Sequence, residues 1–178
     1  MTKAEASHGR LTLVLGGARS GKSRYAESLI EALPKPWIYL ATAEAGDEEM
    51  AARIATHKAR RGTDWRTVEV PHDLAAALGK LPAGAAVLID CLTLWLSNRL
   101  LAGADLDAEV SALTEAVTAH DGALVLVANE VGLSLVPDTA LGRNFRDLQG
   151  LLNQRIAAKA NRVILMVAGL PLIVKDSP

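Results

Sequence analysis

The feature that most constrains this chain is an apolar run that leads into a glycine-rich loop and then into a helical pattern. Residues 11–15 are typical of a buried strand, and residues 23–33 carry apolar side chains at helical spacing. Glycines in such a loop let backbone N–H groups converge on a polyphosphate, and the N-terminus of the next helix favours negative charge. The sequence therefore predicts a nucleotide phosphate site that fits G-x-x-x-x-G-K-[ST], with the residues Gly16, Gly17, Ala18, Arg19, Ser20, Gly21, Lys22 and Ser23.

Three side chains have expected roles in that site. Lys22 would reach the β- and γ-phosphates of a nucleotide, and the Ser23 hydroxyl would be a ligand of Mg²⁺. Asp90 ends a second apolar run, residues 85–90, at the place where an aspartate of a P-loop protein approaches Mg²⁺. The alternative is that Asp90 only caps the helix expected over residues 92–101. We favour the magnesium or nucleotide role because the P-loop lies upstream.

The order of the remaining patterns predicts an α/β fold of the P-loop NTPase class, with a mostly parallel sheet and helices on both faces. Further strands are expected at residues 37–41, 65–70, 85–90, 123–128 and 163–168, with a short antiparallel edge strand at 172–174. Further helices are expected at residues 47–61, 73–78, 92–101, 106–120 and 144–160, whereas residues 133–142 look irregular. We expect residues 1–10 to be a flexible leader and residues 11–178 to be one domain. The strand order does not follow from these patterns.

Composition disfavours several classes of protein. The formal net charge of −1 argues against a broad nucleic-acid or anionic-membrane surface. No apolar run reaches the roughly 18 residues that a membrane-spanning helix needs. Cys91 is the only cysteine and lies in an apolar run, so we expect a core thiol in a reducing compartment. We therefore expect a cytoplasmic protein with no nucleic-acid partner and no membrane insertion.

Two further segments carry candidate functional residues. In the helix expected over residues 47–61, His57 lies where an apolar side meets a basic one. In an arbitrary sequence, His57 would be a surface histidine, and the basic residues that follow it would be a solvated helix face. Asn129 and Glu130 follow an expected strand at the ligand edge of the sheet. Such residues often only fix a turn, so their role stays open.

Several motifs occur besides the P-loop, in one order along the chain. They are YLATA at 39–43, the segment from 53 to 69 that contains His57, LIDCLT at 88–93, ANEVG at 128–132, NFRD at 144–147 and LNQRIAA at 152–158. Together they closely resemble the bifunctional adenosylcobinamide kinase / adenosylcobinamide-phosphate guanylyltransferase family of cobalamin biosynthesis. The resemblance runs from about residue 11 to the C-terminus.

The resemblance implies an enzyme with a RecA-like fold and two reactions. The first transfers the γ-phosphoryl of ATP or GTP to the aminopropanol hydroxyl of adenosylcobinamide. The second transfers GMP from GTP to adenosylcobinamide phosphate, which gives adenosylcobinamide-GDP and pyrophosphate. The resemblance also implies a homotrimer with sites near subunit contacts. Besides the P-loop, it implies nucleotide contacts at Ala41, Thr42, Ala43, Lys58, Ala59, Arg60, Arg61, Glu69 and Asp90.

In this family the guanylyl transfer passes through a histidine–GMP adduct, and the matching residue is His57. Attack of a neutral imidazole on the α-phosphorus would give a phosphoramidate with a readily expelled leaving group. Lys22 and Mg²⁺ would stabilise the charge that develops on pyrophosphate, while Lys58, Arg60 and Arg61 could neutralise other phosphate oxygens. Phosphoryl transfer to a hydroxyl needs no protein nucleophile, so one nucleotide site could serve both reactions.

Other functions remain open from the sequence. The chain could be a monofunctional guanylyltransferase, a kinase for another small hydroxylated substrate, or a RecA-like regulatory NTPase. His57 argues against the regulator, because a switch needs no nucleophile. An ordinary GTPase switch is also disfavoured, since the chain has no N-K-x-D box to read guanine.

Overall fold

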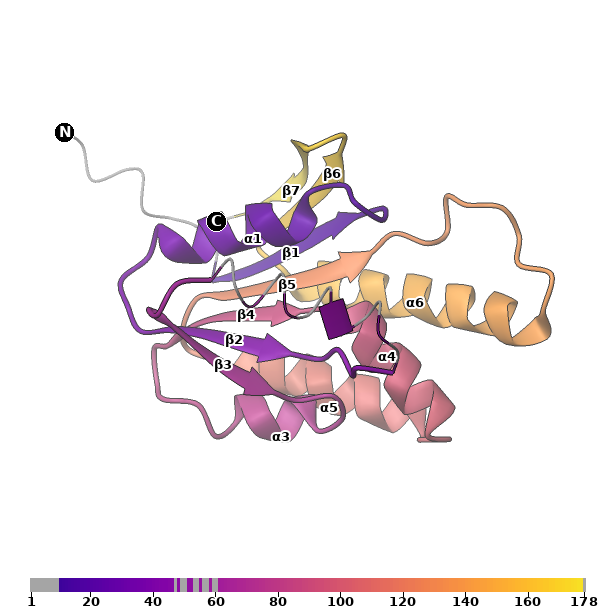
Figure 1. Ribbon diagram of the computed structural model, residues 1–178, viewed down its shortest axis with the longest axis horizontal. Helices are drawn as coiled ribbons and strands as arrows, with labels where there is room; N and C mark the ends of the chain where they lie inside the picture. The colour runs from indigo at the N-terminus through magenta and orange to yellow at the C-terminus, as the bar shows by residue number, and fades with distance from the viewer. Residues whose placement is uncertain are drawn as a thin grey trace.

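The computed structural model describes residues 10–46, 48, 51, 52, 55, 58 and 61–177. Within these residues one sheet contains seven strands in the order β3-β2-β4-β5-β1-β6-β7 (Figure 1). The strands are β1 (Leu11–Gly16), β2 (Trp37–Ala41), β3 (Trp65–Glu69), β4 (Ala86–Asp90), β5 (Leu124–Asn129), β6 (Arg162–Val167) and β7 (Leu170–Asp176). All neighbouring strands are parallel except β7, which runs antiparallel to β6 at the edge. The α/β fold class predicted from the sequence is confirmed.

Helices cover both faces of the sheet (Figure 1). They are α1 (Lys22–Glu31), α3 (Leu74–Leu78), α4 (Leu92–Leu101), α5 (Leu106–Ala119) and α6 (Ala140–Lys159). On one face, α1 packs its buried Ala26 and Ile30 against the strands. On the other face, a larger apolar cluster joins the strands to α3, α4, α5 and α6. Because both faces of the central strands are buried, these strands read as nearly continuous apolar runs.

Alternation along the strands decides which side chains face the P-loop helix. In β4, Ala86 and Leu88 belong to the cluster on the α1 face, whereas Val87 and Ile89 belong to the opposite cluster. Because side chains alternate along a strand, Asp90 lies on the α1 face. Val125 and Val127 of β5 lie on that face as well. Near the ends of β4 and β5, the side chains of Asp90 and Val127 thus lie on the face of the sheet that the P-loop helix α1 covers.

The sequence predicted most boundaries within two residues, but α6 begins at Ala140 and not at residue 144. Thr139 is the N-cap of this helix, and its hydroxyl accepts a hydrogen bond from the Gly142 N–H at 3.1 Å. The sequence prediction treated Gly142 as part of an irregular stretch, whereas the cap places this glycine in the first turn. The last strand is also longer than predicted, since β7 extends over Leu170–Asp176.

Some predictions fall outside the described residues. These include residues 1–9 of the expected leader and much of the helix expected over 47–61, with His57, Ala59 and Arg60. In the part of the chain that the structure describes, no helix is both long and apolar enough to cross a bilayer.

Candidate functional site

The P-loop joins β1 to α1 through a tight turn that requires glycine at its start. A Cβ atom on Gly16 would lie 2.5 Å from the Ser20 Oγ and 2.9 Å from the Met166 carbonyl oxygen. Gly21 has a left-handed φ of 92° and is the N-cap of α1. The Lys22 ammonium donates a hydrogen bond to the Gly17 carbonyl oxygen at 2.9 Å. The loop therefore has the close backbone turn and the folded-back lysine that a phosphate cradle needs.

The turn between β6 and β7 contacts the P-loop and supports it. The Gly169 N–H donates a hydrogen bond to the Ser20 carbonyl oxygen at 3.1 Å. Ala168 and Gly169 have φ values of 52° and 82°, so the chain reverses in a left-handed turn directly beside the loop. A segment far along the sequence thus helps to hold the phosphate-binding loop in position.

Predicted residues of three other strands lie in one row at the carboxyl edge of the sheet. Ala41 of β2 pairs with Glu69 of β3 on one side and with Asp90 of β4 on the other. Gly16 of the P-loop strand pairs with Asn129 of β5. The structure therefore brings the predicted P-loop, the end of β2, Glu69 and Asp90 to the same edge, where ligands bind in open α/β sheets.

Thr42 links the ends of β2 and β4 through its side chain. It is fully buried, its hydroxyl donates to the Cys91 carbonyl oxygen at 2.7 Å, and the Cys91 N–H donates to the same hydroxyl at 2.8 Å. The Asn98 side chain of α4 donates to the Thr42 carbonyl oxygen at 2.9 Å. The Thr42 hydroxyl is thus engaged in the fold, and its predicted contact with the nucleotide stays a prediction. Asn98 was not predicted as part of the site, although a carboxamide inside an apolar helix was a visible signal.

Asp90 is not the cap of α4. Cys91 occupies the N-cap position, so the capping alternative considered for Asp90 is wrong. Its Oδ2 atom is buried and has no hydrogen-bond partner among the described residues. Burial, followed by the Asp90 charge, raises the pKa of the nearby Tyr39 hydroxyl far above its usual range. A half-buried carboxylate with an unpaired oxygen, next to a phosphate loop, suits a Mg²⁺ ion or a polar ligand group.

The other acidic and thiol side chains add little to a metal site. Among the described residues, no group of three or more His, Cys, Asp and Glu side chains could hold a metal ion. Burial raises the pKa of the Cys91 thiol to about 12, and the Asp90 charge acts in the same direction. The Ser23 hydroxyl and nucleotide phosphate oxygens would therefore have to complete the ligand set around Asp90.

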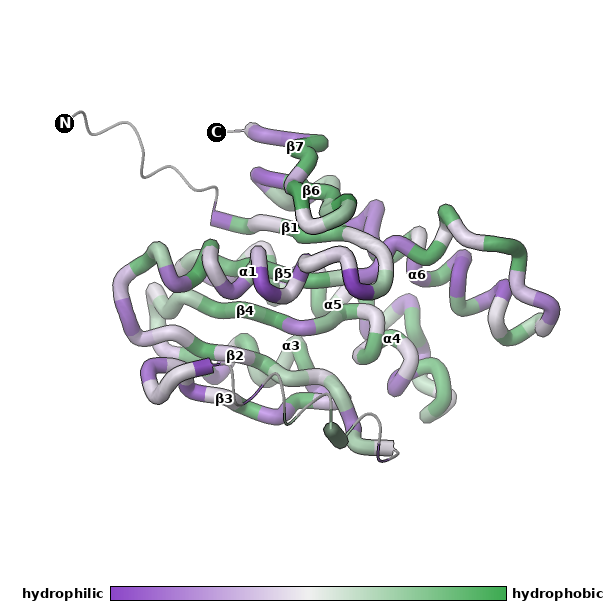
Figure 2. The backbone as a smooth tube through the Cα atoms, turned by 45° about the horizontal axis from the view of Figure 1, so that its top comes forward, coloured by the Kyte–Doolittle hydropathy of each residue, from purple (hydrophilic) through white to green (hydrophobic). Residues whose placement is uncertain are grey.

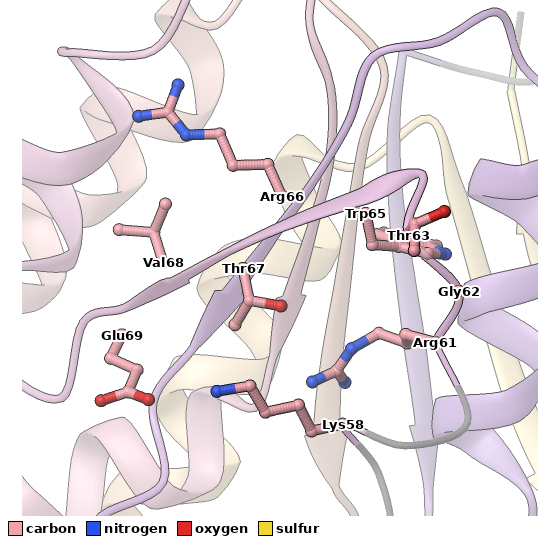
Figure 3. A pocket seen from close by; sticks show the side chains of 9 residues that line it. All are labelled: Lys58, Arg61, Gly62, Thr63, Trp65, Arg66, Thr67, Val68 and Glu69. Carbon is pink, nitrogen blue, oxygen red and sulfur yellow. The ribbon is translucent and has the colours of Figure 1, made fainter.

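A cavity of about 710 Å³ lies beside the edge strand β3 (Figure 3). Lys58, Thr67 and Glu69 lie on one side of this strand, and Arg66 and Val68 point to the other side (Figure 3). The complete lining consists of Lys58, Arg61, Gly62, Thr63, Trp65, Arg66, Thr67, Val68 and Glu69. Three predicted nucleotide contacts, Lys58, Arg61 and Glu69, thus line this cavity.

Arg61 also lines the cavity, but its side chain is 95% buried and packs inward. The guanidinium lies over the Tyr39 ring, and its Nη1 atom is 3.8 Å from the Glu27 carboxylate. The side chain therefore connects the end of the segment that contains His57 with β2 and with the P-loop helix. Its predicted contact with phosphate stays a prediction.

Asn129 is held at the end of β5 by its backbone. Its N–H donates to the Thr93 hydroxyl at 2.7 Å, and its carbonyl oxygen accepts from the Asn153 carboxamide at 3.1 Å. Asn153 accepts in turn from Gln149, and both are buried in α6. The connection of Thr93, Gln149 and Asn153 to the end of β5 was not predicted from the sequence. Two carboxamides four residues apart on one helix face were the available signal.

Glu130 fixes the turn that follows β5. Its backbone N–H donates to the Gly16 carbonyl oxygen at 3.1 Å, and its carboxylate accepts from the Gly132 N–H at 2.7 Å. This is the turn-fixing arrangement that the sequence analysis left open for this residue.

Comparison with known proteins gives one family over nearly the whole chain. Residues 12–174 match the family model described as "Cobinamide kinase / cobinamide phosphate guanyltransferase". The "Bifunctional adenosylcobalamin biosynthesis protein CobP" of Pseudomonas aeruginosa is 50% identical over 169 residues, which cover 93% of this chain and 98% of that protein. The proteins named "Bifunctional adenosylcobalamin biosynthesis protein CobU" of Salmonella typhimurium and Escherichia coli are each 40% identical over 181 residues, with 93% of this chain and 99% of each relative covered.

Solved structures show the fold at much lower sequence identity. An ATPase from the type III secretion system of pathogenic bacteria superposes with a TM-score of 0.54 at 14% identity, covering 88% of this chain and 51% of that one. A protein of Pyrococcus horikoshii OT3 superposes with a TM-score of 0.51 at 10% identity, covering 94% of this chain and 87% of that one. These likenesses support the P-loop NTPase fold and carry nothing about substrates.

Proposed function

Because the chain belongs to the cobinamide kinase / cobinamide phosphate guanyltransferase family, we propose that it carries out both reactions of adenosylcobalamin biosynthesis that this family name describes. It phosphorylates adenosylcobinamide with ATP or GTP. It then transfers GMP from GTP to the phosphate and releases adenosylcobinamide-GDP and pyrophosphate. The observation that carries this proposal is the P-loop beside Asp90 at the carboxyl edge of the sheet.

The phosphate-binding residues support one nucleotide site for both reactions. Lys22 folds over the loop and would transfer its hydrogen bond from the Gly17 carbonyl oxygen to the β- and γ-phosphates of a bound nucleotide. The backbone N–H groups of the loop would hold the same phosphates. Phosphoryl transfer would place the γ-phosphorus next to the acceptor hydroxyl, and guanylyl transfer would place the α-phosphorus next to a nucleophile.

The donor set at this edge fits a magnesium ion. Asp90 offers a carboxylate oxygen with no partner among the described residues, and Ser23 supplies a hydroxyl at the start of α1. When bound, Mg²⁺ would offset negative charge on the phosphate oxygens. The residues of the chain would then orient the phosphates. Lys22 would bind them directly, and Asp90 would act by holding the ion.

His57 is proposed as the residue that accepts GMP. Its neighbour Lys58 lines the cavity beside β3 together with Glu69, which the family resemblance also implies as a nucleotide contact. Neutral imidazole nitrogen would attack the α-phosphorus, and the bond to the pyrophosphate oxygen would break as the phosphoramidate forms. The phosphate of the phosphorylated acceptor would then attack the same phosphorus and restore the imidazole.

A homotrimer is proposed on the family resemblance. The hairpin of β6 and β7 offers an apolar edge that a second copy of the chain could cover, and Figure 2 shows apolar residues along it. Its exposed apolar side chains are Val167, Leu170, Leu172, Ile173 and Val174. Exposed apolar edge strands tend to be covered by a partner chain. The cytoplasmic location stays an expectation from the sequence.

The proposal is tested with GTP labelled at the α-phosphate. The purified protein and a His57→Ala variant are incubated with Mg²⁺ and this nucleotide, and the protein is then treated with acid or base. We expect label on the wild-type protein alone, lost in acid and kept in base, as a phosphoramidate requires. Adenosylcobinamide is then added with unlabelled ATP, and its conversion to the phosphate and to adenosylcobinamide-GDP is followed by chromatography.

Different results point to different alternatives. Formation of the phosphate without the GDP derivative, from a protein that binds GTP but takes no label, would leave a monofunctional kinase. Labelling without phosphorylation would leave a monofunctional guanylyltransferase. Nucleotide hydrolysis without transfer to adenosylcobinamide would leave a regulatory NTPase.

A further inference from the structure

Asn129 occupies a central place at the nucleotide edge of the sheet. Its strand, β5, lies between the P-loop strand β1 and the Asp90 strand β4. Val125 and Val127 face α1, so alternation places Asn129 on the same face as Asp90. Asn129 pairs directly with Gly16, and Asp90 pairs with Val127. Asn129 therefore lies beside the first glycine of the P-loop, on the face of the sheet that also carries Asp90 and two residues beyond the partner of Asp90 along β5.

The position of Asn129 is fixed by groups from three directions. Its N–H is bonded to Thr93 of α4, and its carbonyl oxygen is bonded to Asn153 of α6. The next peptide N–H, from Glu130, is bonded to the Gly16 carbonyl oxygen. These contacts use only backbone atoms of residues 129 and 130, so they hold the residue in place without occupying its carboxamide. Such support from neighbouring side chains is what a positioned ligand group requires.

The Asn129 carboxamide itself is left for a ligand. The hydrogen bonds within the described part of the chain give it no partner, and the residue is half exposed at the edge. The Lys22 ammonium is bonded to the carbonyl oxygen of Gly17, and the preceding residue, Gly16, pairs with Asn129. Because a P-loop lysine in this position would reach the β- and γ-phosphates, the terminal phosphate would lie close to the end of β5.

We propose that the Asn129 carboxamide donates a hydrogen bond to the terminal phosphate of the bound nucleoside triphosphate and orients it for phosphoryl transfer. This inference rests on the proposed function. An amide N–H is a suitable donor here because it pairs with the anionic oxygen without adding a charge. A nucleoside diphosphate lacks the γ-phosphate and therefore cannot accept this hydrogen bond. Asn129 therefore distinguishes GTP from GDP and assists the first of the two reactions.

The test compares the affinities for GTP and GDP, each with Mg²⁺, by isothermal titration calorimetry. The proteins are the wild type, Asn129→Ala, Asn129→Asp and the control Gln154→Ala, which removes an exposed carboxamide from α6. We expect the preference for GTP, measured as the Kd for GDP divided by the Kd for GTP, to fall about tenfold or more in Asn129→Ala. Asn129→Asp should lose more, because it has the same shape but repels the phosphate. The control should keep the wild-type ratio.

Phosphorylation of adenosylcobinamide provides the second readout. At saturating GTP, kcat should fall in both Asn129 variants, whereas a role in structure alone would weaken GTP and GDP binding equally and leave their ratio unchanged. Both variants keep the backbone groups that bind Thr93 and Asn153, and thermal unfolding checks that they fold. An unchanged ratio in both variants, or a wild type with equal affinity for GTP and GDP, would overturn the inference. A wild-type protein that binds neither nucleotide would overturn the proposed function as well.

Discussion

The guanidinium carbon of Arg61 lies 3.4 Å from the centroid of the Tyr39 ring. The arginine side chain is 5% exposed, and the nearby Glu27 side chain is 7% exposed. Tyr39 belongs to β2 and Glu27 to the P-loop helix α1. A positive charge stacked on an aromatic ring is stabilised most when water is excluded. Arg61 is therefore placed to attach the chain just before β3 to the body of the fold.

We predict that Arg61→Ala destabilises the protein by about 2–4 kcal/mol, because it removes a buried cation–π contact and leaves a buried carboxylate with one cation fewer. Urea unfolding followed by circular dichroism measures the change. Arg66→Ala, which removes an exposed arginine of the same cavity, should stay within about 0.5 kcal/mol of the wild type. If Arg61→Ala kept its stability but lost GTP affinity, a phosphate contact would be the better account of this residue.

Asp90 provides a second prediction. Asp90→Asn keeps the shape of the side chain and removes a charge whose Oδ2 atom is buried without a partner in the described residues. The free energy of unfolding without nucleotide should therefore stay the same or rise. Magnesium-dependent phosphorylation should fall by roughly a hundredfold or more, because a neutral carboxamide would hold Mg²⁺ more weakly and the ion would no longer offset the charge on the phosphates.

The two readouts separate the roles of Asp90. Thermal unfolding without nucleotide reports the stability, and the phosphorylation rate over a range of Mg²⁺ concentrations reports the site. An Asp90→Asn protein that unfolds at lower temperature and keeps its rate at all Mg²⁺ concentrations would show a structural carboxylate instead.

The sequence was sufficient where the signal is local. The P-loop, its strand and its helix depend on neighbouring residues, and β2 was predicted with the observed boundaries Trp37–Ala41. The charge of Arg61 indicated a phosphate contact, yet its burial against Tyr39 depends on pairing between distant strands. The strand order depends on the same long-range pairings, so it could not be predicted from local patterns. The helix cap at Thr139 was missed, and residues up to Gly142 were assigned to an irregular stretch.

The polar residues around the site illustrate the same limit. Thr42 was predicted as a nucleotide contact from the resemblance, which stays a prediction, whereas the hydrogen bonds of its hydroxyl to the backbone of Cys91 were not predicted. Residues 42 and 91 are far apart in the chain, and only the adjacency of β2 and β4 brings them together. Asn153 reaches Asn129 for a similar reason, through the packing of α6 on the sheet.

Cys91 gives a prediction for the dependence of stability on pH. Burial raises the pKa of its thiol from 9.0 to about 12. Below pH 9 the thiol is neutral in both the folded and the unfolded protein, so it does not change the stability. Between pH 9 and about 12 the unfolded chain loses this proton first, and the free energy of unfolding should fall.

Cys91→Ala should remove this part of the pH dependence, which urea unfolding between pH 8 and pH 11 would measure as a shallower decline than in the wild type. The thiol of the folded wild-type protein should also react slowly with a thiol reagent at pH 7 and rapidly in denaturant, because the thiolate is the reactive form. Equal slopes for the two proteins, with fast labelling of the folded wild type, would contradict the assignment of Cys91 to a closed interior.

Gly16 and Gly17 form a matched pair for the last prediction. A Cβ on Gly16 would meet the Ser20 Oγ at 2.5 Å and the Met166 carbonyl oxygen at 2.9 Å, whereas a Cβ on Gly17 would meet no atom of the described residues within 4 Å. Gly16→Ala must therefore move the P-loop away from β6, at a cost of about 1–3 kcal/mol. Gly17→Ala should fold with nearly the stability of the wild type.

The comparison has to be made in the absence of nucleotide, because a methyl group on Gly17 could still hinder a phosphate. Urea unfolding then reports the strain in the loop alone, and calorimetry with GTP reports the cradle. We expect Gly16→Ala to lose both stability and GTP affinity, since the displaced loop can no longer present its N–H groups in the required geometry. Equal stability of the two variants would show that the P-loop can move away from Met166 at little cost, so that this contact does not fix the conformation of the loop.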